Sequence, residues 1–154
     1  MRTEQAWRSA PESVHDEYAE AILERAKALV RQGDPATSEL MFRRLLTSPR
    51  HGSTALYGIG VARLAAGDLN AARSFFEETL DREPTNANAL YQLGFIAEKE
   101  GAKTEAIGYY EQALAAFPSH ISARQRLRTL SPPSDSASSA PTFWSRFAAW
   151  ASRT

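Results

Sequence analysis

Residues 53–120 contain one pattern twice: STALYGIGVARLAAGDLNAARSFFEETLDREPTN (53–86) is followed by ANALYQLGFIAEKEGAKTEAIGYYEQALAAFPSH (87–120). Nine of the 34 aligned positions are identical, among them Leu56/Leu90 and Pro84/Pro118. The same frame moved back aligns residues 19–52 with 53–86 at six identical positions. A fixed period of this length indicates a repeat architecture, in which each copy buries its apolar side against the next.

Each copy predicts two helices. In residues 87–120, Leu90, Leu93 and Ala97 recur at the three- and four-residue spacing of a helix. Gly101 then ends this first helix, and Pro118 ends the second. In the first copy, Asp34 and Pro35 supply a helix cap and a first-turn proline. Since strand-like alternation is absent from the sequence, the predicted fold class is all-α.

The order of residue types resembles the tetratricopeptide repeat. That family shows a Leu-Gly pair, a mid-repeat Gly, then Ala, an aromatic residue, Ala and a closing Pro. The third copy matches at Leu93, Gly94, Gly101, Ala106, Tyr110, Ala113 and Pro118. The second copy has Thr79 in place of the second Ala, and the first has Arg25-Ala26 in place of Leu-Gly and Ser38 in place of the first Ala. The resemblance covers 102 of 154 residues and implies three tandem helix–turn–helix repeats (19–52, 53–86 and 87–120) that form a short right-handed solenoid.

Both ends of the array have expected extensions. Within residues 1–18, the segment from Pro11 to Tyr18 is expected to extend the first helix toward the N-terminus. Residues 121–130 are expected to form a capping helix, because the last repeat has no neighbour to cover it. In that helix we expect apolar residues to pack inward and basic residues to face water, namely Ile121, Leu127 and Leu130 against Arg124, Arg126 and Arg128.

A linker and an aromatic tail follow. Residues 131–141 include five Ser and three Pro, a composition with nothing to bury. Residues 142–154 predict an amphipathic helix, since exposed aromatic residues on one side oppose arginines on the other: Phe143, Trp144, Phe147 and Trp150 against Arg146 and Arg153. We interpret the tail as a docking element. The alternative is a tail that packs permanently on the repeats as one more capping helix.

Composition excludes several classes of function. The chain has 18 basic and 18 acidic residues, which argues against nucleic-acid binding by bulk charge. It has no Cys, and His15, His51 and His120 lack the spacing of a metal site. Phosphate-loop and nucleophile motifs are absent from the sequence. We therefore expect no enzyme activity, no cofactor and no metal.

The sequence also bears on location. No apolar run approaches the ~20 residues that a membrane-spanning helix needs, and residues 1–10 are polar and charged, unlike a secretory signal. We expect a cytoplasmic protein, which the tail can also hold at the periphery of a membrane.

The family resemblance implies a concave groove, lined by the first helix of each repeat, that binds a peptide from a partner protein. The residues it assigns to the groove are Leu23, Lys27, Arg31, Tyr57, Val61, Leu64, Asn88, Tyr91, Gln92, Phe95 and Lys99. Chaperone-binding members clamp a C-terminal carboxylate with Lys, Asn and Arg. Of the corresponding residues here, Leu23, Lys27, Gly58, Asn88 and Gln92, only Lys27 is a cation. The groove therefore suits an apolar or amphipathic peptide rather than a clamped carboxylate.

Three hypotheses remain. The leading one is a non-catalytic protein–protein adaptor with a peptide groove and the tail as a second docking element. The second is a peripheral membrane scaffold tethered by the tail, because Arg146 and Arg153 oppose its aromatic side. The third is self-association or autoinhibition, because residues 121–154 carry a net charge of +4 and residues 53–120 a net charge of −4.

Overall fold

The protein is described by a computed structural model, which covers residues 12–131. The expectations for residues 1–11, for the linker beyond Ser131 and for the tail lie outside these residues. The described part is all-helical, as predicted, and contains no strand. Its helices are α2 (Glu12–Arg31), α3 (Pro35–Arg43), α4 (Gly52–Ala65), α5 (Leu69–Arg82), α6 (Ala87–Lys99), α7 (Lys103–Ala116) and α8 (Ile121–Leu130).

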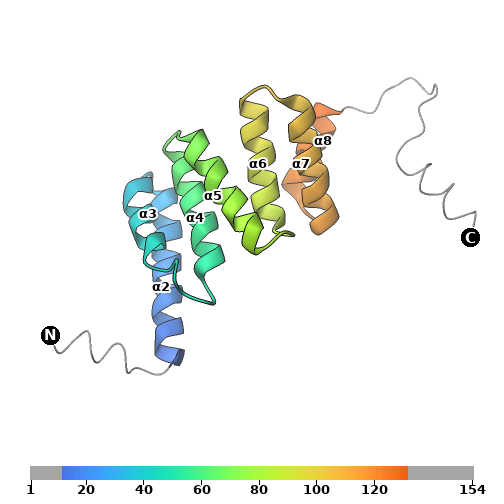
Figure 1. Ribbon diagram of the computed structural model, residues 1–154. Helices are drawn as coiled ribbons and strands as arrows, with labels where there is room; N and C mark the ends of the chain where they lie inside the picture. The colour runs from blue at the N-terminus through green and yellow to red at the C-terminus, as the bar shows by residue number, and fades with distance from the viewer. Residues whose placement is uncertain (1–11, 132–154) are drawn as a thin grey trace, which may run out of the picture.

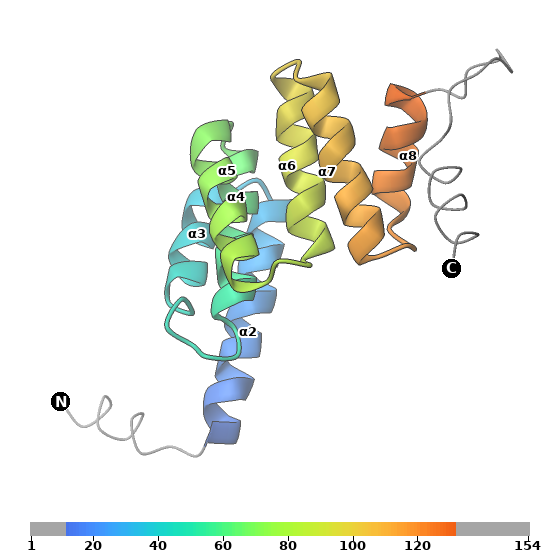
Figure 2. The ribbon, with the colours of Figure 1, turned by 45° about the vertical axis from the view of Figure 1, so that its right-hand side comes forward.

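The helices follow one another in a row of antiparallel pairs (Figure 1). The pairs α2–α3, α4–α5 and α6–α7 correspond to the three sequence copies, and α8 packs against α7. After a turn of the view, α2 and α8 still lie at opposite ends of the row (Figure 2). The chain is therefore a short helical solenoid.

The turns within the repeats are built alike. Gly33, Gly67 and Gly101 have φ angles of 83°, 83° and 80°, the left-handed region that glycine enters without steric cost. Asp34 and Asp68 follow two of these glycines and cap α3 and α5 by accepting backbone N–H bonds of 3.1 and 3.0 Å. Because these glycines recur at the same place in each copy, the first helices of the repeats end at residues 31, 65 and 99, which are 34 apart.

Small residues opposite aromatic rings bring the paired helices close together. A Cβ added to Gly60 would lie 2.6 Å from the Phe76 ring, and one added to Gly94 would lie 2.7 Å from the Tyr110 ring. The first copy, which lacks this glycine, is held differently. Its Ser38 is fully buried and donates a 2.8 Å hydrogen bond to the carbonyl of Ala26. The departures of the first copy from the repeat pattern are therefore compatible with the same fold.

The second helix of the first copy is shorter than its counterparts. Helix α3 ends at Arg43, after which Arg44 and Leu45 donate backbone bonds to residues three positions back. Pro49 lies one residue earlier than the closing prolines of the other copies and disfavours helical geometry at the residue before it. The connection to α4 is correspondingly longer.

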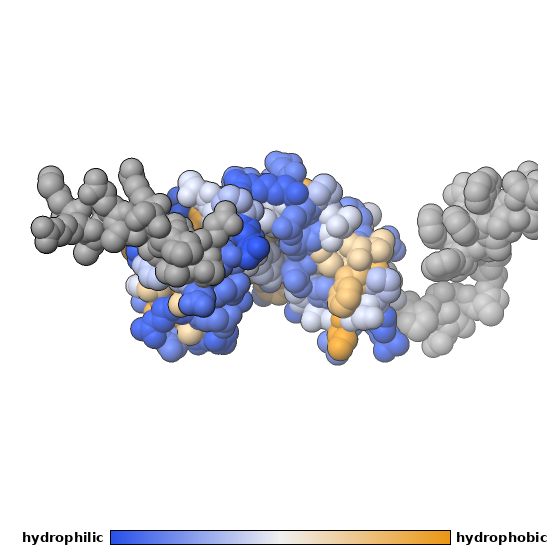
Figure 3. All heavy atoms as spheres, turned by 90° about the horizontal axis from the view of Figure 1, so that it is seen from below, coloured by the Kyte–Doolittle hydropathy of each residue, from blue (hydrophilic) through white to orange (hydrophobic). Residues whose placement is uncertain are grey.

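Helix α8 is rotated relative to the expectation. Ala123 is fully buried, and Leu127 and Leu130 pack with it against α7, whereas Ile121 is 68% exposed. The expectation that Ile121 packs inward is therefore wrong, because it lies on the side of α8 away from Ala123. With Phe117, which is 53% exposed, it belongs to the apolar surface at the α8 end of the row (Figure 3).

Candidate binding site on the inner face

The first helices of the repeats share one surface, which we call the inner face. It is defined by the expected groove residues Lys27 and Arg31 on α2, Tyr57 and Val61 on α4, and Gln92, Phe95 and Lys99 on α6. A hollow of about 220 Å³ lies between α2 and α4. Its lining residues are Lys27, Val30, Arg31, Phe42, Thr54, Tyr57, Gly58 and Val61. Four of the expected groove residues thus meet around one cavity.

The floor of the hollow is apolar because Gly58 has no side chain. A Cβ at Gly58 would lie 2.4 Å from the Phe42 ring, so the chain can bring this ring to the hollow only with glycine at that position. The equivalent residue of the third copy is Gln92. Sequence reasoning missed Gly58 and Phe42 as lining residues, although the exchange of Gly for Gln between two otherwise similar copies was a visible signal.

Tyr57 forms the wall of the hollow toward the second and third repeats. Its ring packs against Phe76 with centroids 5.6 Å apart, and its hydroxyl accepts a 3.3 Å hydrogen bond from the Gln92 side chain. Burial raises the pKa of Tyr57, so its hydroxyl stays protonated at neutral pH. The hollow therefore combines apolar walls with one polar group at its edge.

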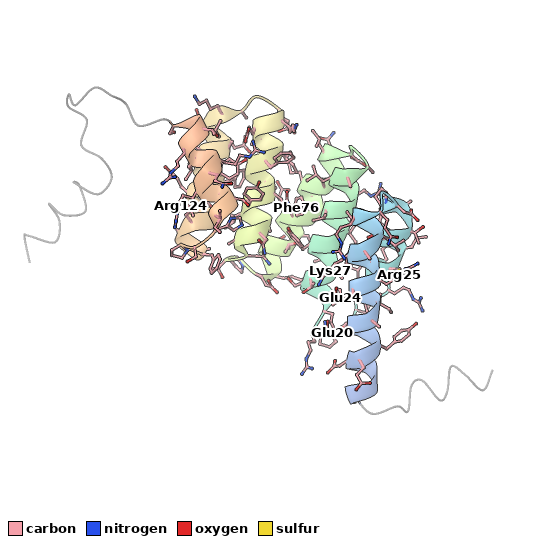
Figure 4. The ribbon with its side chains drawn as sticks, turned by 180° about the vertical axis from the view of Figure 1, so that it is seen from behind. Glu20, Glu24, Arg25, Lys27, Phe76 and Arg124 are labelled. Carbon is pink, nitrogen blue, oxygen red and sulfur yellow. The ribbon has the colours of Figure 1, made fainter. Side chains whose placement is uncertain are left out.

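Basic residues of α2 flank the hollow. Lys27 pairs with Glu24 at 2.8 Å, whereas no carboxylate of the described residues lies within 4.0 Å of Arg31. Figure 4 shows Glu20, Glu24 and Lys27 along one side of α2 and Arg25 on the opposite side. The stripe that faces the hollow is consequently acidic toward the N-terminal half of α2 and basic at its C-terminal end.

A second cationic group surrounds Phe95 in the third repeat. The Lys99 ammonium lies 5.3 Å from the centre of the Phe95 ring, and the Arg126 guanidinium from α8 lies 5.6 Å from it. Arg126 also pairs with Glu98 at 3.1 Å, and its interaction with the Tyr91 hydroxyl raises the pKa of its guanidinium. Arg126, which was expected to face water, keeps 39% of its side chain exposed and also binds across to α6.

The remaining expected groove residues differ in their surroundings. Tyr91 is partly buried and stacks on His120 at a centroid distance of 5.1 Å. Leu64 is partly buried against the core of the second and third repeats, and Asn88 is exposed. Leu23, by contrast, is 3% exposed and belongs to the core between α2, α3 and α4. The expectation that Leu23 lines the groove is wrong, because it points into the repeat.

Residues 12–131 also bear on membrane insertion and metal binding. None of these helices is long and apolar enough to cross a membrane. Within the same residues, no cluster of three or more His, Asp or Glu side chains is arranged to hold a metal ion.

Solved structures with the same architecture include proteins of diverse roles. The chain is similar to MamA, with 22% identity and a TM-score of 0.62 over 73% of this chain and 66% of MamA. It is similar to the first TPR of Spaghetti (RPAP3) bound to the HSP90 peptide SRMEEVD, with 17% identity and a TM-score of 0.65 over 73% of this chain and 90% of the other. The Yersinia enterocolitica type III secretion chaperone SycD, in complex with a peptide of the translocator YopD, gives 13% identity and a TM-score of 0.65 over 79% and 94%. At these identities the likeness concerns the fold.

The sequence comparisons agree with the fold. Among curated proteins, no sequence matches the chain. Two family profiles, both described as tetratricopeptide repeat, match residues 23–87 and 63–130 and together cover residues 23–130, from within the first repeat to the end of α8. Together with the recurring turn glycines and the paired-helix packing described above, these matches show that the chain belongs to the tetratricopeptide repeat family.

Proposed function

We propose that this protein is a non-catalytic adaptor whose inner face binds an apolar or amphipathic segment of a partner protein. The observation that carries the proposal is the hollow of about 220 Å³ between α2 and α4. An apolar cavity of about 150 Å³ is large enough to bind benzene. The hollow therefore has room for a Phe or Leu side chain of a bound segment, with Phe42, Val61 and the Tyr57 ring around it.

Two structural neighbours support this assignment by analogy. The RPAP3 repeat domain is bound to an HSP90 peptide, and SycD is bound to a YopD peptide. Their identity to this chain is low, so the analogy concerns the kind of ligand that such a fold accommodates. The choice of this particular surface rests on the hollow itself.

The test is to block the hollow without disturbing the core. Thr54 lines the hollow but is exposed on α4, so Thr54→Trp adds an indole at its mouth. Gln112→Trp, at an exposed position of α7, is the matched control. Peptides selected from a random displayed library on the full chain should bind the control normally and lose at least about tenfold in affinity on Thr54→Trp. Equal binding to both variants would remove the hollow from the site.

The tail carries the second part of the proposal. We assign residues 142–154 as a second docking element because the spacing of four large aromatic residues in this short segment predicts one apolar side of a helix. If its target is a membrane, the full chain should float with vesicles of phosphatidylserine and phosphatidylcholine but not with phosphatidylcholine alone. A chain in which Phe143, Phe147 and Trp150 are replaced by Ser should not float. If neither chain floats, the membrane is excluded as the target of the tail, and the proposed target is a protein.

A further inference from the structure

We propose that the segment bound by the inner face is acidic as well as amphipathic, with an apolar side chain in the hollow and carboxylates toward Arg31 and Lys99. This inference rests on the proposed function and specifies the chemistry of the partner. Its basis is the distribution of charge on α2, α4 and α6, which differs from the charge of the repeats as a whole.

The carboxylates near the hollow lie toward the N-terminal half of α2, where Glu24 pairs with Lys27 at 2.8 Å and Glu20 lies 3.8 Å from His51. Helix α4 contains no acidic residue, and the single one of α6, Glu98, is occupied by Arg126 at 3.1 Å and by the Tyr110 hydroxyl at 2.9 Å. The net charge of −4 over residues 53–120 therefore comes from the second helices and the turns, as with Glu77 on α5 and Glu111 on α7.

Two cations of the inner face have no carboxylate in ion-pair contact, although Arg31, after Lys27, helps to lower the pKa of the nearby Glu24. Arg31 and Lys99 stand at the C-terminal ends of α2 and α6, and no carboxylate among the described residues lies within 4.0 Å of either. The last-turn cation of α4 behaves differently, because Arg63 is bound by Glu39 at 2.8 Å and by Asp68 at 3.5 Å. The helix dipole favours all three cations, but only Arg31 and Lys99 lack an ion pair, with Lys99 over the Phe95 ring. They flank an uncharged stretch of α4 that includes Tyr57 and Val61.

The same pattern opposes one alternative for the occupant. The tail of this chain carries Arg146 and Arg153 and no acidic residue. Placed on the inner face, it would bring two cations toward Arg31, Lys99 and Arg126, whereas Glu20 and Glu24 lie toward the N-terminal half of α2. We therefore commit to a partner protein, and not to the tail, as the source of the bound segment.

The probes are two peptides that differ only in charge. One has the sequence of residues 142–154, and the other carries Arg146→Glu and Arg153→Glu in that same sequence. We expect the full-length protein to bind the acidic peptide about tenfold more tightly than the native one, since its two carboxylates can pair with Arg31 and Lys99 and the arginines of the native peptide cannot. This preference should shrink as salt is raised to about 1 M.

Two pairs of substitutions locate the effect. Arg31→Gln with Lys99→Gln should abolish the preference for the acidic peptide, measured by fluorescence anisotropy. Arg25→Gln with Lys103→Gln removes two other exposed cations and should leave it intact; Arg25 lies on the opposite side of α2 from Lys27 (Figure 4). An unchanged preference in the Arg31/Lys99 variant would overturn the inference, as would equal binding of the two peptides or no binding of the acidic one.

The outcomes separate this inference from the proposed function. If Thr54→Trp blocks both peptides but neither is preferred, the hollow remains the site and the acidic partner is refuted. If Thr54→Trp blocks neither peptide, both proposals fail. Tighter binding of the native tail peptide would overturn the acidic partner and favour self-association.

Discussion

Gly94 and Gly108 allow the packing of the third repeat to be tested with one matched pair of substitutions. Both glycines lie inside helices, α6 and α7, and each is replaced by Ala. A Cβ at Gly94 would lie 2.7 and 2.8 Å from two atoms of the Tyr110 ring, whereas nothing lies within 4 Å of a Cβ at Gly108. The same methyl group is thus added once against a buried ring and once into open space.

The expected changes in the free energy of unfolding have opposite signs at the two positions. Ala in place of Gly within a helix stabilises by about 0.5–1 kcal/mol, and this gain is available at both positions. At Gly94 the carbon atoms would have to separate by about 1 Å to reach ordinary contact. The Tyr110 ring is fully buried and its hydroxyl is held by Glu98 at 2.9 Å, so it has little freedom to yield. Overpacking of this kind costs about 1–3 kcal/mol, and the net result at Gly94 is a loss of about 0.5–2 kcal/mol.

Urea denaturation followed by circular dichroism measures both variants. We expect the midpoint to rise for Gly108→Ala and to fall for Gly94→Ala, with unchanged slopes, which places the two about 1–3 kcal/mol apart. If Gly94→Ala is as stable as Gly108→Ala, α6 and α7 do not approach each other at this ring, and the account of the packing is refuted.

Three further predictions follow from single contacts. Asp34→Ala should destabilise the chain by about 1 kcal/mol, because α3 loses the cap that accepts the Thr37 N–H; Asp34→Asn, which keeps an acceptor, should restore most of the loss in thermal denaturation. Gly58→Gln should reduce the affinity for groove-binding peptides by at least about tenfold, because its Cβ would collide with the Phe42 ring and displace it from the floor of the hollow; an unchanged affinity in calorimetry would contradict the assigned floor. Burial and the hydrogen bond to Glu98 raise the pKa of Tyr110, so the folded state retains a proton that the unfolded state loses above about pH 10. Stability should fall as the pH rises through that value, and Tyr110→Phe should flatten the fall in the melting temperature, whereas equal slopes for both chains would contradict this assignment.

Much of the fold could be predicted from the sequence, because the features that set it are local. A glycine at the same place in each copy and an Asp after two of them mark the same turn, and the period of 34 carries this turn along the chain. Since each repeat contacts mainly its neighbours, the local pattern determines the long-range arrangement.

The candidate site was only partly predictable. The family resemblance placed Lys27, Arg31, Tyr57 and Val61 on one surface, where the structure brings them around a single hollow. The resemblance could not show that Leu23 turns into the core or that Phe42, on a different helix, reaches the hollow beneath Gly58. Both depend on how closely neighbouring helices approach, which a single sequence expresses only through the size of facing residues.

The end of the array was the least predictable part. Ile121 was expected to pack inward and is exposed, and the contact of Arg126 with Glu98 was not expected. The rotation of α8 is set by the fit of Ala123 against α7 and by the reach of Arg126 to Glu98, and neither contact has a counterpart in the preceding copies. A helix that follows the last repeat lacks the internal comparison that guided the interpretation of the others.

The most direct test of the inner face as the binding surface is an amide chemical-shift map of the ¹⁵N-labelled full chain titrated with the acidic tail-derived peptide. We predict that the largest changes occur around the hollow and along α6, at residues 27–31, 54–61 and 92–99. Changes concentrated on α5 and α7 instead, or confined to the exposed apolar end near Phe117 and Ile121, would contradict the account.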